Sequence, residues 1–102
     1  MSYWKSFLQT NGVTIFSKTT CPYCVEVKEI FDALDVKYKA VEVNQGWTDG
    51  QITQLKQETG HNSFPNVWVG NTCLKGCSDV KKLLDNESLF PILSQHGVSF
   101  TK

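Results

Sequence analysis

Hydrophobic and polar positions repeat along the chain with two different periods. β-Branched and aromatic residues fill the runs 13–16 and 66–69, and apolar residues recur over 38–43, which predicts three β-strands. Elsewhere, apolar residues lie three and four positions apart, as on one face of an α-helix. The predicted helices cover residues 2–10, Pro22 to Leu34, 49–59, Ser78 or Asp79 through Leu84, and Asn86–Ser88 to Gly97.

Turn residues mark where these helices and strands end and how they are connected. Gly60 ends the helix 49–59, and the Gly-Asn pair at 70–71 joins strand 66–69 to a fourth strand at 72–74 as a hairpin. The first two strands, joined by a helix, should run parallel through a right-handed crossover, whereas the hairpin is antiparallel. We therefore expect one domain over 1–102, an α/β three-layer sandwich with a four-stranded mixed sheet and about five flanking helices.

Composition excludes several classes of partner. Ten Lys balance ten Asp plus Glu, and the chain contains no Arg, so its formal net charge is zero. By electrostatics alone, such a chain is a poor binder of nucleic acids and anionic membranes. No apolar run approaches the ~18 residues that cross a bilayer, and the first residues lack the layout of a signal peptide. We expect a cytoplasmic monomer with neither nucleic-acid nor membrane partners. In such a reducing compartment, the four cysteines are expected to be catalytic or metal-binding, and not to form structural disulfides.

A Cys-Pro-Tyr-Cys motif at 21–24 follows the first strand and opens a helix. This is the layout of a thioredoxin-like redox motif. The free N–H groups and the positive dipole end of the helix stabilise an anion at Cys21, and Lys18 adds a positive charge nearby. Cys24 shares the apolar stripe of Val27, and burial there disfavours a thiolate. The pattern predicts Cys21 as the nucleophile and Cys24 as the resolving thiol.

Thiolate stabilisation affects attack and departure differently. A thiol of pKa ~8.5 is about 3 % ionised at pH 7. Lowering that value by ~3.5 units gives roughly 30-fold more thiolate, but intrinsic nucleophilicity falls by roughly 25- to 55-fold. The gain is therefore in leaving ability, and we expect the site to favour release of Cys21 from a mixed disulfide by a second thiol.

Three segments resemble dithiol glutaredoxins, namely Lys18 to Cys24, Ser63 to Val67 and Gly76 to Asp79. With the element order, the resemblance extends over essentially the whole chain. It implies a thioredoxin-like fold and thiol–disulfide exchange with glutathione as the co-substrate. Protein–glutathione mixed disulfides would be reduced through Cys21 alone, and disulfide-bonded proteins through both Cys21 and Cys24.

The same resemblance implies a glutathione site. The residues that would form it are Lys18, Tyr23, Phe64, Pro65, Cys77, Ser78 and Asp79. Pro65 would be a cis-proline that faces Cys21, and the Phe64 backbone would pair with the tripeptide. Ser78 and Asp79 would hold its γ-glutamyl end.

The chain also departs from the family pattern. Residues 63–65 read Ser-Phe-Pro in place of the usual Thr-Val-Pro, so a phenyl ring narrows or reshapes the groove. Lys75 replaces a Gly; it is strained if φ is positive there, and otherwise adds a cation near the carboxylates of glutathione. A common Gln aligns with Ile52, where either Gln51 or Gln54 could substitute. Because the chain contains no Arg, the carboxylates of glutathione would have to be bound by lysines, which act as point charges.

Several residues have two interpretations. Ser78 and Asp79 fit a helix cap and first-turn acid as well as a ligand site, and one helix N-terminus can serve both. Cys77 is either a buried thiol or a regulatory one. Trp47 is either a surface aromatic or a substrate contact.

Two metal-based functions compete with glutathione chemistry. A structural zinc site would use the four thiolates of Cys21, Cys24, Cys73 and Cys77. Against it, 48 residues separate the two pairs. Some glutaredoxins share an iron–sulfur cluster between two subunits, bound by the active-site cysteine and glutathione. The resemblance disfavours such a cluster on Cys21, because in that family a proline at the position of Pro22 accompanies poor cluster binding. His61 and His96 have no partner at metal-ligand spacing, and we expect no metal.

Overall fold

The computed structural model describes residues 2–102, and its elements follow the predicted order. The elements are η1 (Tyr3–Phe7), β1 (Val13–Ser17), α1 (Pro22–Ala33), β2 (Tyr38–Glu42), α2 (Asp49–Thr59), β3 (Asn66–Val69), β4 (Thr72–Lys75), α3 (Cys77–Asp85) and α4 (Leu89–Gln95). The helix predicted over 2–10 is shorter than expected. It is a 3-10 helix that ends at Leu8, where the backbone becomes extended, as is common for short helical pieces.

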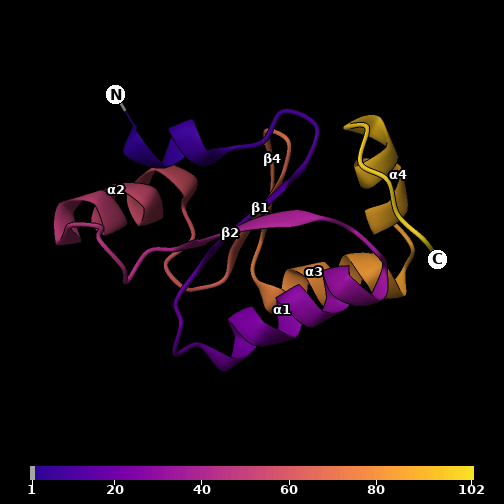
Figure 1. Ribbon diagram of the computed structural model, residues 1–102, viewed down its shortest axis with the longest axis horizontal. Coiled ribbons are helices and arrows are strands. Elements are labelled where there is room, and N and C mark those ends of the chain that lie inside the picture. The colour runs from indigo at the N-terminus through magenta and orange to yellow at the C-terminus, as the bar shows by residue number, and fades with distance from the viewer. Residues whose placement is uncertain (1) are drawn as a thin grey trace.

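The four strands form one mixed sheet in the order β2-β1-β3-β4. β1 pairs in parallel with β2 and antiparallel with β3, and β3 and β4 form the predicted hairpin. In Figure 1, α1 and α3 lie together on one side of the strands, and η1 and α2 lie on the other. The predicted three-layer, thioredoxin-like sandwich is confirmed.

Each face of the sheet covers its own hydrophobic cluster. Side chains alternate along a strand, so Val13 and Ile15 of β1 face one cluster and Phe16 faces the other. The first cluster is covered by α1, α3 and α4, and the second by η1 and α2. Because β1 is buried on both faces, the position where it ends is fixed firmly, and that end leads directly to the Cys-Pro-Tyr-Cys motif.

The α3 helix begins earlier than the sequence predicted. Its N-cap is Gly76, not Ser78 or Asp79, so Cys77 is already helical. A glycine has no side chain with which to cap, and the Asp79 carboxylate instead accepts the Gly76 N–H at 3.1 Å from inside the first turn. The predicted end of α2 at Gly60 is confirmed, since Gly60 is its C-cap with φ 69°.

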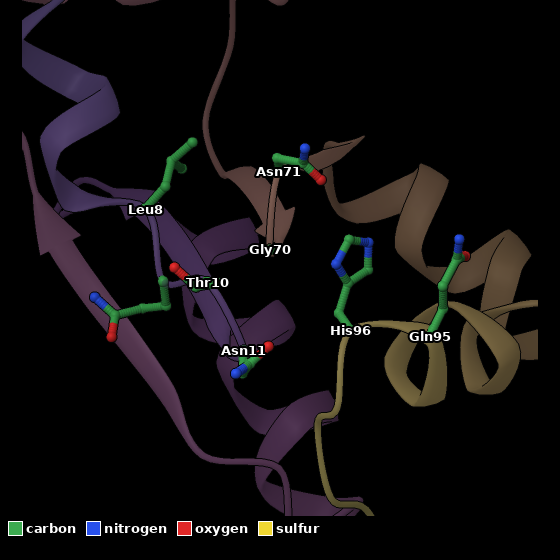
Figure 2. Close-up of a pocket in the computed structure, with 8 residues that line it drawn as sticks. Leu8, Thr10, Asn11, Gly70, Asn71, Gln95 and His96 are labelled. Carbon is green, nitrogen blue, oxygen red and sulfur yellow. The ribbon is translucent and has the colours of Figure 1, made fainter.

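A hollow of about 420 Å³ lies at the opposite end of β1 from the motif. Figure 2 shows the His96 ring beside Gly70, with Asn11, Asn71 and Gln95 around it. The His96 Nε2 and Thr72 Oγ1 atoms are 2.9 Å apart. This hollow contains no thiol. Among residues 2–102, none of the helices has the length and apolar character needed to span a membrane.

Candidate active site

The β1–α1 junction presents the sulfur of Cys21 at the start of a helix. Cys21 is the N-cap of α1, with extended backbone (φ −97°, ψ 113°), and Pro22 occupies the first helical position. The backbone N–H of Cys24 donates to Cys21 Sγ at 3.3 Å. A free N–H donor and the positive end of the helix dipole therefore both point at this half-buried sulfur.

Cys24 is fully buried beneath Cys21, as predicted. Burial, and secondly the contact with the Cys21 side chain, raise the pKa of the Cys24 thiol from 9.0 to about 11. Cys24 therefore keeps its proton at neutral pH. The two sulfurs lie in different environments. Cys21 is half-buried and has an N–H donor, whereas Cys24 is fully buried.

The segment before β3 closes over the sulfur from the other side. The Phe64–Pro65 peptide bond is cis, as the resemblance implied. The Cys21 thiol donates to the Phe64 carbonyl oxygen at 3.5 Å. Lys18 lies beside the same residue, with its Nζ 5.0 Å from the centroid of the Phe64 ring.

The N-terminus of α3 supplies the third wall. Cys77 is 7 % exposed, and its thiol donates to Glu26 Oε2 at 3.5 Å. Burial, followed by this contact with Glu26, raises the pKa of the Cys77 thiol. Lys75, just before the helix, has φ 69°, so of the two possibilities for this residue the strained left-handed backbone is the one observed.

These walls enclose a hollow of about 300 Å³. Its lining residues are Tyr23, His61, Ser63, Phe64, Pro65, Gly76, Cys77, Ser78 and Asp79. Six of them are residues that the resemblance assigned to glutathione. Lys18 and Cys21 join the hollow through their contacts with Phe64, and Cys24 lies behind Cys21. The fold thus brings all nine predicted site residues together.

His61 belongs to the hollow but was not among the predicted site residues. Its Nε2 lies 3.1 Å from the Pro65 carbonyl oxygen and 3.4 Å from Ser63 Oγ. The ring also lies against Gly76, where a Cβ would come within 3.1 Å of it. The only available sequence signal was that His61 stands just before the Ser-Phe-Pro segment.

The two candidate glutamines on α2 both have polar contacts within the protein. Gln51 Oε1 accepts the Thr48 N–H at 2.9 Å, so this side chain caps the helix. Gln54 lies beside Glu58, and Ile52 packs against the second hydrophobic cluster. Lys56, also on α2, has its Nζ 5.8 Å from the Phe64 ring centroid.

The four cysteines do not gather into a zinc site. Cys73 packs against the η1 and α2 side of the sheet, where its thiol donates to Asn66 Oδ1 at 3.9 Å. Cys77 belongs to the cluster on the other face. Over the described part of the chain, residues 2–102, no three His, Cys, Asp or Glu side chains lie close enough to share a metal ion.

Comparison with known proteins points to one family. The model of the glutaredoxin family matches residues 13–74. The chain is similar to a glutaredoxin of Ricinus communis, with 37 % identity over 98 residues that cover 95 % of this chain and 96 % of the relative. It is also 38 % identical to glutaredoxin-C2 of Arabidopsis thaliana over 94 residues, covering 91 % of this chain and 85 % of the relative.

Solved structures give the same result. A buckwheat glutaredoxin–glutathione complex superposes with a TM-score of 0.79 and 36 % identity, covering 83 % of this chain and 78 % of that one. A mutated buckwheat glutaredoxin superposes with a TM-score of 0.83 and 33 % identity, covering 92 % and 86 %.

Proposed function

The chain belongs to the glutaredoxin family, and we propose that it reduces protein–glutathione mixed disulfides and protein disulfides through Cys21 and Cys24, with glutathione as the co-substrate. The observation that carries this proposal is the contrast between the two sulfurs. Cys21 Sγ accepts a helix N–H, whereas Cys24 is fully buried and has a raised pKa. Only one sulfur is suited to act as the exchanging thiolate.

In the monothiol route, the Cys21 thiolate attacks the glutathione sulfur of a mixed disulfide. The S–S bond breaks, and the protein leaves as a thiolate that takes up a proton. A second glutathione thiolate then attacks the glutathione sulfur bound to Cys21. Oxidised glutathione forms and Cys21 departs as a thiolate, which the first turn of α1 stabilises.

The dithiol route uses Cys24 only after a protein disulfide has been opened. Cys21 first forms a mixed disulfide with the protein. Cys24, on losing its proton, then attacks the Cys21 sulfur and expels the protein thiolate. The resulting Cys21–Cys24 disulfide is reduced by two molecules of glutathione. A Cys24 pKa of about 11 keeps this thiol out of the monothiol route at neutral pH.

In this proposal, the hollow holds the tripeptide in an extended form. Ionisation of Cys21 removes the S–H donor from the Phe64 carbonyl oxygen, which leaves this acceptor free for an N–H of glutathione. At the other wall, the Asp79 carboxylate at the N-terminus of α3 suits the α-ammonium group of the γ-glutamyl residue. Because the reaction consumes reduced glutathione, we also propose that the protein works in a reducing compartment, the cytoplasm. We propose separately that it acts as a monomer, since one chain supplies both cysteines and the lining of the hollow.

Serine variants of the cysteines test this proposal. Cys21→Ser should lose both activities, whereas Cys24→Ser should keep mixed-disulfide reduction and lose protein-disulfide reduction. Mass spectrometry of Cys24→Ser after exposure to oxidised glutathione should show one glutathione on Cys21. Cys73→Ser, outside the hollow, serves as the control. An active Cys21→Ser variant together with an inactive Cys24→Ser variant would reverse the assigned roles.

A further inference from the structure

A side-chain hydrogen bond joins the two ends of the loop between α2 and β3. Thr59 is the last residue of α2 and Asn66 is the first of β3, and Asn66 Nδ2 donates to Thr59 Oγ1 at 3.1 Å. The loop between them, residues 60–65, forms one wall of the active-site hollow. Its residues that line the hollow are His61, Ser63, Phe64 and Pro65. The hydrogen bond therefore closes this wall at its base.

The neighbouring hydrogen bonds fix the direction of this one. An indole N–H can only donate, and Trp68 Nε1 donates to Asn66 Oδ1 at 2.8 Å. The oxygen of the amide therefore faces Trp68, and its NH2 group faces Thr59. The Thr59 hydroxyl accepts from that group and donates its own hydrogen to the Leu55 carbonyl oxygen at 2.7 Å. Hydrogen bonds thus run in one direction from β3 into α2, and none of them can be reversed.

Burial makes the Asn66 amide dependent on these partners. Asn66 is 1 % exposed, so water cannot replace a lost acceptor, and a buried N–H group without a partner is costly. Backbone contacts give the loop little support, because within residues 60–65 only the Gly60 N–H donates to a backbone carbonyl, that of Lys56. Side-chain hydrogen bonds, including the one between Asn66 and Thr59, therefore hold the loop.

The base of the loop is also joined to the strand that leads to the reacting sulfur. Asn66 lies opposite Phe16 in the antiparallel pair of β1 and β3, and β1 leads to Cys21. Within the loop, the Phe64 carbonyl oxygen accepts from the Cys21 thiol at 3.5 Å. Asn66 is thus linked to β1 by its backbone and to α2 by its side chain. These two links together determine where the Phe64 carbonyl lies relative to the sulfur.

We propose that Thr59 and Asn66 are positioning residues of the active site. Their hydrogen bond holds the Phe64 carbonyl where an N–H of glutathione can bind it while the glutathione sulfur meets Cys21. This inference rests on the proposed function. Both side chains act through the loop and not on the reacting atoms, so their loss should weaken binding of the glutathione moiety and leave the exchange chemistry unchanged.

The test removes the Thr59 hydroxyl and measures steady-state kinetics with a glutathione mixed disulfide of a short peptide. Thr59→Val keeps the shape of the side chain but leaves Asn66 Nδ2 without its acceptor. KM should rise roughly fivefold, the worth of one hydrogen bond, with kcat unchanged. Thr59→Ser keeps the hydroxyl and should retain the KM of the unmodified protein. A serine variant as impaired as the valine variant would show that the hydroxyl has no such role.

Thr14→Val is the matched control. Thr14 is buried, and its hydroxyl oxygen accepts the Gln9 N–H at 3.2 Å, at the end of β1 far from Cys21. This variant should lose stability to urea much as Thr59→Val does, but keep the original KM. An unchanged KM in Thr59→Val, or an equal rise in Thr14→Val, would overturn the inference. A failure of the proposed function differs, since the unmodified protein would then not turn over the substrate.

Discussion

His61 Nε2 lies 3.1 Å from the carbonyl oxygen of Pro65. A carbonyl oxygen only accepts hydrogen bonds, so Nε2 is the nitrogen that carries the hydrogen in this contact. Pro65 itself is buried, and the preceding carbonyl, that of Phe64, accepts from Cys21. Two consecutive carbonyls of the cis-proline segment are thus held by side chains from different parts of the chain.

Replacing His61 should therefore loosen this segment. His61→Ala leaves the Pro65 carbonyl without its donor, which should lower the free energy of unfolding by about 1–2 kcal/mol. It should also raise KM for glutathione mixed disulfides severalfold, with a smaller effect on kcat. Urea unfolding and steady-state kinetics measure the two effects.

His61→Gln provides the control for this prediction, because its side-chain amide offers an N–H donor without the imidazole ring. It should recover most of the stability and of the KM. If His61→Ala were as stable and as active as the unmodified protein, the contact with Pro65 would have no role in positioning the segment.

Lys75 should be a site where glycine is stabilising. Its φ of 69° lies in the left-handed region, which costs a residue with a Cβ about 1–2 kcal/mol. Lys75→Gly removes that cost but gives the unfolded chain more freedom, worth about 0.5–1 kcal/mol. The net gain in unfolding free energy should be about 0.5 kcal/mol, measured by urea unfolding.

Lys75→Ala is the matched variant, because it removes the charge and keeps the Cβ. It should show no gain in stability. Equal stabilisation by Ala and Gly would mean that the lysine side chain, and not the backbone, limits stability at this position.

Local patterns predicted most of the fold and the central pair of thiols. The helix that begins at the Cys-Pro-Tyr-Cys motif could be predicted because its signals lie within one short segment. These signals are Pro22 at the first helical position and the apolar residues spaced three and four apart from Cys24 onward. The start of α3 could not, since Gly76 offers no side chain and its cap comes from Asp79, inside the helix.

The missing parts of the site depend on contacts between distant segments. Lys56 lies near the Phe64 ring only because α2 packs on the face of the sheet where Phe64 lies. His61 acquires its role from the carbonyl of Pro65 and from the closeness of Gly76. No spacing rule marks such residues, because their partners are defined by tertiary structure.

Gly70 should tolerate alanine less well than Gly60 does, although both have positive φ, 56° and 69°. A Cβ on Gly70 would overlap the His96 ring (Figure 2), whereas nothing lies within 4 Å of a Cβ on Gly60. Gly60→Ala should lower the free energy of unfolding by about 1 kcal/mol, because of the backbone conformation alone. Gly70→Ala should cost about 1–2 kcal/mol more, because the ring must move.

Thermal or urea unfolding of both variants measures this difference. A Gly70→Ala/His96→Ala double variant isolates the overlap, since removing the ring should reduce the added cost of the Gly70 substitution to that seen at Gly60. Equal losses for the two single variants would contradict the predicted clash.

The buried thiol of Cys24 should make stability depend on pH in the alkaline range. Its pKa is raised from 9.0 to about 11 in the folded protein, first by burial. A pKa raised by folding means that the folded state binds the proton more tightly, so the contribution to stability is complete below pH 9. It is lost as pH rises from about 9 to about 11, by about 3 kcal/mol in total.

Burial also raises the pKa values of Tyr38, Cys73 and Cys77, so these groups add their own pH dependence of stability. The measurement is therefore a comparison of urea unfolding at pH 8 and pH 10.5, under reducing conditions, for the unmodified protein and Cys24→Ala. Cys24→Ala lowers the free energy of unfolding at both pH values because packing is lost. It also removes the titrating thiol, and with it the Cys24 contribution to the pH dependence. The variant should lose less stability between the two pH values, and an identical loss in both proteins would show that Cys24 ionises no later when buried than in the unfolded chain.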